Sequence, residues 1–460
     1  MKVLLIQSHL GRIKSFPPLF PIGICYIATA LQGKHKVKIL DLNLRELPQA
    51  YEELEKEIVA FAPDVAGISI RDIDTTSRAD IFFNFKTIRP TAQLIKKANS
   101  NVKLLAGGAG FSIFAQKIME RIPEFDYGVF LEGEESVSEL LENLGSPEKV
   151  KGIFYRKNGT VTFTGLREFP DFSKVPIPVR EPNLIDINQY IGPMENNIGI
   201  QSKRGCMLNC IYCGYPFLSG RRLRLRMPQS VADEIEYLMK LGVRKFTFVD
   251  NIFNIPPAHA KGICEEIIKR GLDIEWSAWF EIKNATKELI LLAKKAGCKH
   301  FGFSPDGSTN KALSVLKKDI TEEDIGKNLE IIKKTDGIRA GYNFFLTLPN
   351  TGLRDMIKTL ILYFKIPIFL FGRGSVYISW VRIEPHTEIH KIAIEEGSIS
   401  KDTDLLPAEQ SELPKLFYTN PSYRYFEYSV LYLIKFMEQV VKPFGKFILR
   451  HNLVRKKKSK

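Results

Sequence analysis

The sequence has no long, uninterrupted apolar segment. A membrane-spanning helix needs roughly 18 consecutive apolar residues, and the best candidate, MIKTLILYFKIPIFLFG, is interrupted by Lys358, Lys365 and Pro367. The beginning of the chain, MKVLLIQSHLGR, has an apolar core that is too short for a secretory signal peptide. These two absences predict a cytoplasmic protein.

Cysteine is scarce, with six residues in a chain of 460. Six cysteines are too few for a disulfide scaffold, and Cys206, Cys210 and Cys213 lie close together in the sequence KRGCMLNCIYCGYP. Clustered, reduced thiols are typical metal ligands. Cys264 and Cys298 lie in segments with a helix-like pattern and have no nearby partner in the sequence. We therefore expect them to be buried as small hydrophobic residues.

Acidic residues are fewer than basic ones: 52 Asp and Glu against 66 Lys and Arg, a formal net charge of +14. Residues 442–460 hold eight Lys or Arg and no acid, so this tail contributes more than half of the excess. We find no basic stripe interleaved with aromatic residues and expect no nucleic-acid partner. Hydrophobic (44%) and charged (26%) contents are those of globular proteins, and the length predicts two to four domains.

Residues 1–145 alternate short apolar strands with amphipathic helices. Five strands with intervening helices predict an α/β domain with a doubly wound parallel sheet. Ligands of such sheets bind beyond the carboxyl ends of the strands. Four polar or glycine-rich stretches follow the predicted strands: 41–43, 69–74, 107–112 and 132–134. Residues 146–195 are rich in proline and turn residues, which predicts a linker with a short hairpin.

Four stretches of the first domain, FPPLFPIGICYIATAL, GISIRDID, AGGAGF and LEGEES, resemble the cobalamin-binding domain that precedes many radical S-adenosylmethionine (SAM) enzymes. The resemblance implies cobalamin contacts from Asn43, Ser69, Arg71, Gly107, Gly108, Gly110, Phe111, Glu132, Gly133 and Glu134. In the broader fold a D-x-H-x-x-G motif supplies an axial histidine, but here the stretch is DLNLRE. Asn43 in place of the histidine implies cobalamin without a protein imidazole on its lower face. The glycines also fit a tight turn that binds no ligand.

The cysteine spacing, C-x3-C-x2-C, differs from the two separated C-x2-C pairs of a zinc ribbon. Three thiolates on a four-iron cluster leave one iron without a protein ligand. With Tyr212 before the last cysteine, the spacing resembles the radical SAM signature. The resemblance implies a 4Fe-4S cluster held by Cys206, Cys210 and Cys213, S-adenosyl-L-methionine on the open iron, and release of a 5'-deoxyadenosyl radical. A structural zinc site or a chance cluster is the alternative.

The resemblance continues through residues 196–395, where six strands alternate with helices and imply a partial (β/α)6 barrel. The mouth of such a barrel would gather Asp250, Asn251, Asp306, Pro349 and Arg382 at the carboxyl ends of the strands. Asp250 and Asn251 match positions that contact the methionyl end of SAM. Asp306 stands where relatives have a glutamate, and its carboxylate would accept hydrogen bonds from ribose hydroxyls. Aspartates at strand ends otherwise often cap helices.

Two further features leave alternatives open. The arginines of GRRLRLR (220–226) would contact a phosphate or the corrin side chains, or form a solvated face. His386 and His390 would bind a metal, or lie at a helix cap or on the surface.

Residues 396–460 form a basic block with a helical pattern. Tyr425, Tyr428, Leu431 and Tyr432 recur at helical spacing, which predicts one apolar face. This face would pack across the barrel mouth. Alternatively, it would form an amphipathic segment whose polybasic end contacts anionic lipid as a peripheral membrane anchor.

The resemblances together imply a cobalamin-dependent radical SAM enzyme. A methyltransferase acting on an unactivated carbon is the expected activity, because a non-acidic C–H bond requires a radical before it can be methylated. The alternatives are a radical rearrangement or cyclisation without net methyl transfer, and a non-catalytic iron-sulfur electron-transfer protein. The expected partners are a small-molecule or lipid substrate and an external electron donor of the flavodoxin or ferredoxin type.

Overall fold

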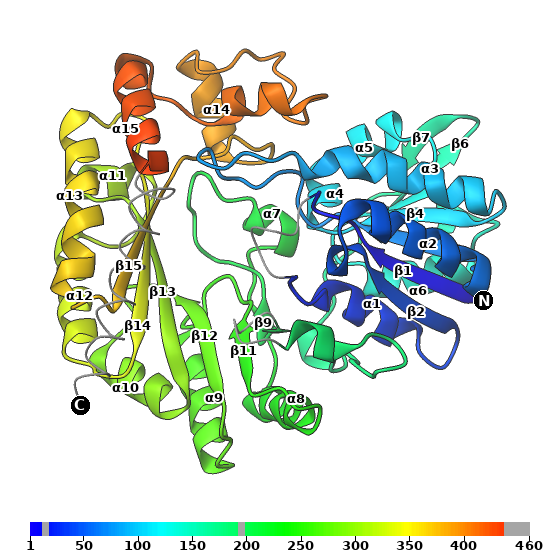
Figure 1. Ribbon diagram of the computed structural model, residues 1–460, viewed down its shortest axis with the longest axis horizontal. Helices are drawn as coiled ribbons and strands as arrows, with labels where there is room; N and C mark the ends of the chain where they lie inside the picture. Colours follow the sequence, from blue (N-terminus) through cyan, green and yellow to red (C-terminus); the bar gives the residue numbers. More distant parts are fainter. Residues whose placement is uncertain (12–17, 192–197, 437–460) are drawn as a thin grey trace, which may run out of the picture.

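The computed structural model describes residues 1–11, 18–191 and 198–436. Two α/β units lie side by side, with a helical C-terminal segment along one end of the second unit (Figure 1). Within the described residues, no helix is long and apolar enough to cross a membrane. The basic tail predicted at residues 442–460 lies outside the described part of the chain.

The N-terminal unit is a seven-stranded sheet with the order β2-β1-β3-β4-β5-β6-β7. Its first five strands are parallel, as the alternating pattern predicts, and β6 and β7 add an antiparallel hairpin to the edge. The expected hairpin therefore extends this sheet. The strands and helices of the unit are β1 (Lys2–Gln7), α1 (Ile22–Leu31), β2 (Lys36–Asp41), α2 (Leu47–Phe61), β3 (Val65–Ser69), α3 (Ile88–Ala98), β4 (Lys103–Gly107), α4 (Ala109–Ile113), α5 (Ala115–Arg121), β5 (Tyr127–Val129), α6 (Glu134–Glu142), β6 (Ile153–Lys157) and β7 (Thr160–Phe163).

Local sequence explains these elements. In β1 every residue after Lys2 is buried, as expected for a central strand that is covered on both faces. In α2 the buried residues are Ala50, Leu54, Ile58 and Phe61, whose spacing places them on one side of a helix. The opposite side of α2 faces solvent, so the helix covers the sheet with a single apolar stripe.

The second unit is a six-stranded parallel sheet with the order β15-β14-β13-β12-β11-β8. In the part of the chain that is described, its edge strands β8 and β15 do not pair with each other, so it is an open, partial barrel. Its elements are β8 (Gly199–Ile200), β9 (Lys203–Arg204), α7 (Tyr215–Ser219), β10 (Arg224–Leu225), α8 (Pro228–Lys240), β11 (Lys245–Phe248), α9 (Pro257–Lys269), β12 (Glu275–Phe280), α10 (Lys287–Lys295), β13 (Cys298–Asp306), α11 (Asn310–Val315), α12 (Glu322–Lys333), β14 (Arg339–Phe345), α13 (Leu353–Phe369) and β15 (Gly374–Ser379).

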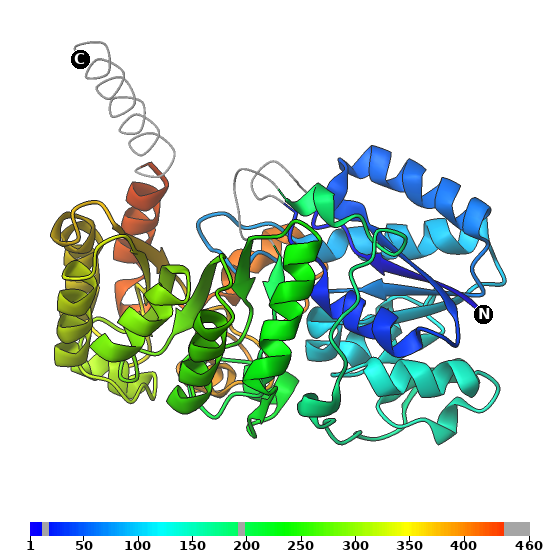
Figure 2. The same ribbon diagram turned by 90° about the horizontal axis from the view of Figure 1, so that it is seen from below.

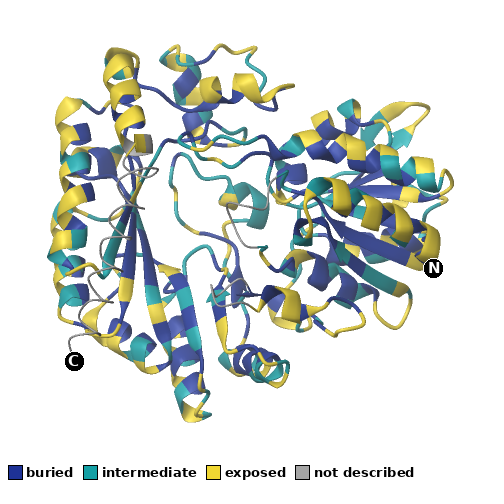
Figure 3. Cartoon of the chain, in the orientation of Figure 1, coloured by how far each residue is buried: buried dark blue, intermediate teal, exposed yellow. Residues whose placement is uncertain are grey.

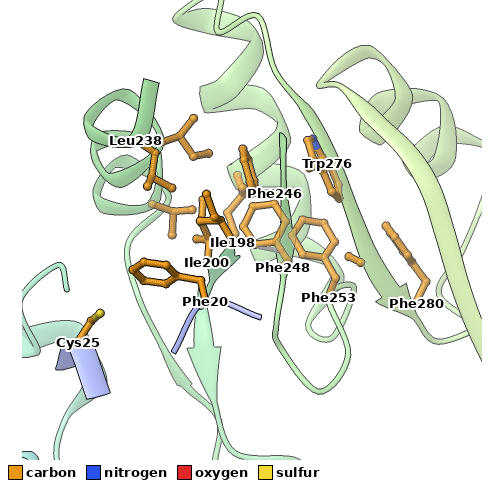
Figure 4. Packing of buried hydrophobic residues seen from close by; sticks show 14 of the residues in the cluster. Phe20, Cys25, Ile198, Ile200, Leu238, Phe246, Phe248, Phe253, Trp276 and Phe280 are labelled. Atoms are coloured by element: carbon orange, nitrogen blue, oxygen red, sulfur yellow. The ribbon is translucent and has the colours of Figure 1, made fainter. Parts of the chain in front are cut away.

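One hydrophobic core crosses the boundary between the two units. Phe20 and Cys25 of the N-terminal unit belong to the same buried cluster as Ile200 and Phe248 of the second sheet (Figure 4). Trp276, fully buried in this cluster, donates its indole N–H to the Ala296 carbonyl oxygen at 2.7 Å. A shared core fixes how the two sheets face each other.

The C-terminal segment contains α14 (Glu388–Glu395) and α15 (Arg424–Phe436). Helix α15 lies beside α13 on the outer side of the second unit, in two perpendicular views (Figures 1 and 2). Val430 and Leu431 of α15 pack with Met356 of α13 and with Trp380. The helix predicted near residue 425 is therefore present, but its predicted apolar face is not the buried one: Tyr425, Tyr428 and Tyr432 are exposed, and only Leu431 of the four packs against the barrel.

Candidate functional site

The three clustered cysteines lie on a loop that leaves β9 and returns through α7 to β10. Strands β9 and β10 pair as a short antiparallel ribbon and close the base of this loop. At Gly205, just before the first cysteine, φ is +92° and an added Cβ would lie 2.1 Å from the Arg222 carbonyl oxygen. Only glycine tolerates this close approach. The Cys206 amide donates to the Gly220 carbonyl oxygen at 3.0 Å and holds both ends of the loop together.

The chemistry of the loop fits an iron-sulfur cluster. Cys206, Cys210 and Cys213 are free thiols, and Cys206 is buried. Burial raises the pKa of Cys213 to about 12 and also raises the pKa of Cys206, with further contributions from the neighbouring thiols. Buried thiols that lie close together favour a bound cation, which stabilises their thiolate forms.

No group of three or more described His, Cys, Asp or Glu side chains converges closely enough to bind a single metal ion. Each cysteine of a four-iron cluster binds a different iron, so convergence on one point is not required.

Tyr212, which lies in this loop, contacts Asp306, which was expected at the barrel mouth without a prediction of this pairing. The Tyr212 hydroxyl donates to the Asp306 carboxylate, and the Tyr212 ring packs edge-on against Phe345 with centroids 4.9 Å apart. Asp306 ends β13 with φ +64° and is 1% exposed. Its carboxylate is already used within the protein, and contact with a SAM ribose stays a prediction.

Lys318 completes this cluster, and the sequence analysis missed it. Its Nζ lies 2.6 Å from an Asp306 carboxylate oxygen and 3.0 Å from the Ser304 carbonyl oxygen. Burial alone would lower the pKa of Lys318, but the Asp306 carboxylate and the Cys210 thiol raise it above its usual value. Lys318 thus places a buried cation beside one cluster cysteine. No spacing or motif in the sequence marks this residue.

Asp250 orders the chain that leads into the cysteine loop. It is 3% exposed, and its carboxylate accepts from the Ser202 amide at 2.7 Å, from the Lys203 amide at 3.2 Å and from the Ser202 hydroxyl. Asp250 therefore binds the backbone between β8 and β9 and does not cap a helix, and its contact with SAM stays a prediction. Asn251 is half-buried, and its side-chain amide is 3.5 Å from the Gly205 carbonyl oxygen, next to the loop.

The glycines after β4 are required by backbone packing. Gly108 has φ +99°, and an added Cβ would lie 2.6 Å from the Ile70 carbonyl oxygen. The Gly110 amide donates to the carbonyl oxygens of Ile70 and Arg71 at 2.9 and 3.0 Å. These contacts bring the loops after β3 and β4 together, and contact of the glycines with cobalamin stays a prediction. Gly107 ends β4, and Ser69 ends the neighbouring β3.

Phe111 differs from its expected role as a cofactor contact. Its side chain is fully buried and packs edge-on against Phe154, with ring centroids 6.3 Å apart. An added Cβ on Gly128 would lie 2.3 Å from this ring, so Phe111 fills the core beneath the sheet. The apolar ring turns away from the strand ends because burial is favourable there. Arg71, by contrast, is exposed and pairs with Asp72 at 2.7 Å.

Asn43 uses its whole side-chain amide to hold the loop after β1. Its Nδ2 donates to the Ser8 carbonyl oxygen at 3.0 Å and to Asp41 at 2.8 Å, and its Oδ1 accepts from the Leu10 amide at 2.9 Å. The neighbouring His9 is fully buried, and its ring nitrogens bond the Arg45 carbonyl oxygen and the Gly11 amide. Neither side chain is free to coordinate a ligand at this edge.

The two acids after β5 bind the arginine that precedes the cysteines. The Arg204 guanidinium donates to Glu132 at 2.9 Å and to Glu134 at 2.6 Å. Arg224 also pairs with Glu132, and the Arg204 guanidinium lies over the rings of Tyr26 and Phe172. These contacts connect the end of the first sheet to the cluster loop, and the expected contact of both acids with cobalamin stays a prediction. The adjacent Gly133 precedes α6, where an added Cβ would lie 3.0 Å from Ile27.

Of the four arginines of GRRLRLR, Arg221 and Arg222 are exposed, whereas Arg224 and Arg226 are buried. Arg224 and Arg226 are 9% and 2% exposed, and Arg226 pairs with the fully buried Glu234. Paired, buried guanidinium groups of this kind leave little free charge to contact a phosphate or a corrin side chain.

A second ionic contact joins the two units at the barrel mouth. Arg382, expected to project into the mouth, donates to Asp74 of the N-terminal unit at 3.1 Å and to the Leu405 carbonyl oxygen at 2.9 Å. Pro349 is buried after β14. Helix α7, which follows the cysteines, packs against α4, which follows β4. The carboxyl ends of both sheets therefore meet at the cysteine loop.

Cys264, Cys298 and His386 pack against other side chains of the protein. Cys264 and Cys298 are fully buried in the core, which confirms the hydrophobic interpretation, although Cys298 begins strand β13 and does not lie on a helix. Burial, with the neighbouring Cys264 thiol, raises the pKa of Cys298. The His386 ring stacks on Phe217 of α7 with ring centroids 3.8 Å apart.

Comparison with known proteins agrees with this arrangement. Residues 9–141 match the B12 binding domain, and residues 200–362 match the radical SAM superfamily. The chain is 26% identical over 381 residues to an uncharacterized methyltransferase of Pyrococcus horikoshii, covering 80% of this chain and 79% of the relative. It is 24% identical to an anaerobic magnesium-protoporphyrin IX monomethyl ester cyclase of Rubrivivax gelatinosus, covering 78% of this chain and 65% of that protein.

Solved structures show the same fold. The structure of the radical SAM methyltransferase TsrM from Kitasatospora setae has a TM-score of 0.75 and 20% identity, over 92% of this chain and 84% of the other. The chain therefore joins a B12-binding domain to a radical SAM domain and is a cobalamin-dependent radical SAM enzyme with cobalamin, SAM and a 4Fe-4S cluster as its cofactors.

Proposed function

We propose that this protein methylates an unactivated carbon of its substrate. When bound, the cofactors supply a 5'-deoxyadenosyl radical and a transferable methyl group. The observation that carries the proposal is the packing of α7, next to the cluster cysteines, against α4 at the carboxyl end of the first sheet. A methyl donor and a radical source held at these two edges would lie on either side of one substrate.

The chain's own residues would fix this geometry. Arg204 is two residues before Cys206, and its ion pairs with Glu132 and Glu134 keep the cluster loop against the first sheet. Arg382 and Asp74 form a second contact between the units at the barrel mouth. Two separate contacts resist rotation of one unit against the other, and a displacement of about 1 Å is enough to slow a positioned reaction.

The similarity to these relatives supports methyl transfer but does not decide which reaction is catalysed. The Pyrococcus protein is named a methyltransferase, and TsrM is a methyltransferase of the same fold. The similarity to the Rubrivivax cyclase favours a second candidate, a radical cyclisation without net methyl transfer. An external electron donor of the flavodoxin or ferredoxin type would supply the electron for either reaction. The substrate would be a small molecule or a lipid.

Product analysis distinguishes the two candidates. A methylating cycle uses one SAM to make the radical and a second to restore the methyl donor, so 5'-deoxyadenosine and S-adenosylhomocysteine should form together with methylated product. A cyclisation would give 5'-deoxyadenosine without matching S-adenosylhomocysteine. Extracts from cells with and without the gene would be compared for compounds that differ by one methylene mass, and the purified holoenzyme would then be assayed with the compound found. Turnover without substrate-dependent S-adenosylhomocysteine would exclude methyl transfer.

A further inference from the structure

Helix α13 carries a row of exposed apolar side chains along its outer side. These residues recur every three or four positions and therefore share one face. Ile368 is 76% exposed, and Phe371, just after the helix, is 74% exposed. The row consists of Leu353, Ile357, Ile361, Phe364, Ile368 and Phe371. The opposite face packs on β15 through buried residues such as Leu362 and Ile366. A helix that only covers a sheet would expose polar residues here, so a continuous apolar row indicates a binding surface.

The accessible charges of α13 itself are basic, and one of them, Lys358, pairs with Glu322 of α12 at 3.3 Å. Arg354 and Lys365 are exposed on the same helix, and Lys358 is half-buried. The single acid of α13, Asp355, is 9% exposed and accepts from the Gly352 amide at 2.8 Å and from the Thr309 hydroxyl. The outer side of α13 therefore presents apolar and cationic groups without a compensating carboxylate of its own.

Helix α15 continues this surface beside α13. Tyr425 and Tyr432 are 88% and 68% exposed, and Leu433 and Phe436 are about half exposed. Figure 3 shows exposed residues along both helices. The single acid of α15, Glu427, is fully buried against Arg78 and the Asn420 amide. Both helices thus bury their only carboxylate and expose aromatic, aliphatic and basic side chains.

We propose that α13 and α15 lie in the interfacial layer of an anionic lipid bilayer. Tyrosine and phenylalanine favour this layer, where apolar rings enter the acyl boundary, and Arg354 and Lys365 would contact anionic headgroups. Helix α13 has 17 residues, a length of about 25 Å at 1.5 Å per residue, which suits a helix parallel to the membrane plane. The sequence that follows α15 adds eight Lys or Arg and no acid in residues 442–460.

Charge argues against a second copy of the chain as the occupant. In a symmetric dimer the same surface meets itself, so Arg354 and Lys365 of both copies would face like charges. Anionic headgroups complement this surface over its whole length. The inference does not depend on the reaction, because it concerns the outer side of the barrel and none of the residues around the cysteine loop.

The experiment is vesicle flotation of the full-length, cluster-reconstituted protein. The probes are vesicles of phosphatidylcholine with phosphatidylglycerol, and vesicles of phosphatidylcholine alone. The variant Ile361→Asn/Phe364→Ser/Ile368→Asn should bind the anionic vesicles at least ~10-fold more weakly, because its apolar contact is lost. Arg354→Gln/Lys365→Gln should lose a factor of about five per charge on anionic vesicles only.

The matched control is Val59→Asn/Leu166→Ser, which changes two apolar residues of the other unit that are 70% and 67% exposed. This control should bind like the unchanged protein. All variants should keep their thermal midpoint and their rate of SAM cleavage. Insertion is measured independently by tryptophan fluorescence. Brominated lipids should quench the fluorescence of Phe364→Trp and should not quench that of Val59→Trp.

Three results would overturn the proposal. In the first, the α13 triple variant binds vesicles as well as the unchanged protein, and truncation before residue 442 abolishes binding. The tail alone would then bind the membrane. The second is a dimer in light scattering that the triple variant converts to a monomer, with no vesicle binding in either state. The third is a protein that floats with neither vesicle type, in which case the surface would serve a protein partner.

Discussion

Arg204 and Glu134 lie 70 residues apart in the sequence, and the Arg204 guanidinium donates to the Glu134 carboxylate at 2.6 Å across the boundary of the two units. Arg204 is two residues before the first cluster cysteine, and Glu134 begins α6 at the carboxyl end of β5. The contact couples the position of the cysteine loop to the edge of the sheet that binds cobalamin.

Removing this arginine should destabilise the join between the units. Arg204→Ala leaves Glu134, which is 11% exposed, without its cation, while Glu132 keeps Arg224. Loss of one partner of such a pair costs about 3–5 kcal/mol. We expect a lower thermal midpoint and faster proteolysis between residues 163 and 199. Arg244→Ala, at an exposed position, is the control and should cost less than about 1 kcal/mol.

A double-mutant cycle shows whether the arginine acts through the acids. Combining Arg204→Met with Glu134→Gln should recover much of the lost stability, because both charges of this pair are removed together while Glu132 keeps Arg224 as its partner. Additive losses would contradict the ionic role of Arg204.

Substitution by alanine should distinguish the three cluster cysteines from the cysteines of the hydrophobic core. Cys206→Ala, Cys210→Ala or Cys213→Ala should each abolish the four-iron spectrum and reduce 5'-deoxyadenosine to background, because each thiolate holds one iron. The matched control, Cys264→Ala, changes a fully buried thiol far along the chain and should retain both signals. SAM cleavage retained by Cys210→Ala would be incompatible with the assignment. The measurements are iron content, electron paramagnetic resonance and product chromatography after anaerobic reconstitution.

Cobalamin should bind without a protein imidazole on its lower face. Asn43 is saturated by Ser8, Asp41 and Leu10, and both ring nitrogens of His9 are engaged. The cobalt(II) electron paramagnetic resonance spectrum should therefore be identical for unlabelled and 15N-labelled protein. Free cobalamin, with its own nitrogenous base, provides the reference splitting. A splitting that changes with the protein's isotope would show that a histidine ligates the cobalt.

The attachment of α15 should weaken as pH rises. Burial raises the pKa of Glu427 to about 7, although the Asn420 amide and Arg78 partly offset it. The carboxyl of the unfolded chain ionises near 4.5, so the unfolded state loses its proton first as pH increases. The contribution of Glu427 to the free energy of unfolding is therefore full below pH ~4.5 and is lost as pH rises through about 7. The loss is on the order of 3 kcal/mol.

Glu427→Gln should flatten this dependence. Thermal midpoints and the rate of proteolytic release of α15, measured across that pH window, provide the test. Glu148→Gln, at an exposed position, should keep the pH dependence of the unchanged protein. A pH dependence that is equal in Glu427→Gln and in the unchanged chain would assign it to another group.

The sequence alone determined that the chain forms two α/β sheets and that three cysteines are the ligands of the cluster. Alternation of apolar strands with amphipathic helices is a local signal, so five parallel strands and then six were predictable from residues 1–145 and 196–395. The C-x3-C-x2-C spacing is local too, and it placed Asp306 in no contact: the pairing of Asp306 with Tyr212 came only from the folded chain. The helical pattern around Tyr425 was predictable for the same reason.

Only the tertiary structure decided which polar residues bind each other. Glu132 and Glu134 follow a strand just as ligand-binding acids do, and only the folded chain brings Arg204 against them. Lys318 carries no local signal, yet its Nζ reaches Asp306. The apolar pattern of α13 is the same whether its outer side is covered or exposed. Pairing and exposure depend on contacts between distant segments, which local periodicity does not encode.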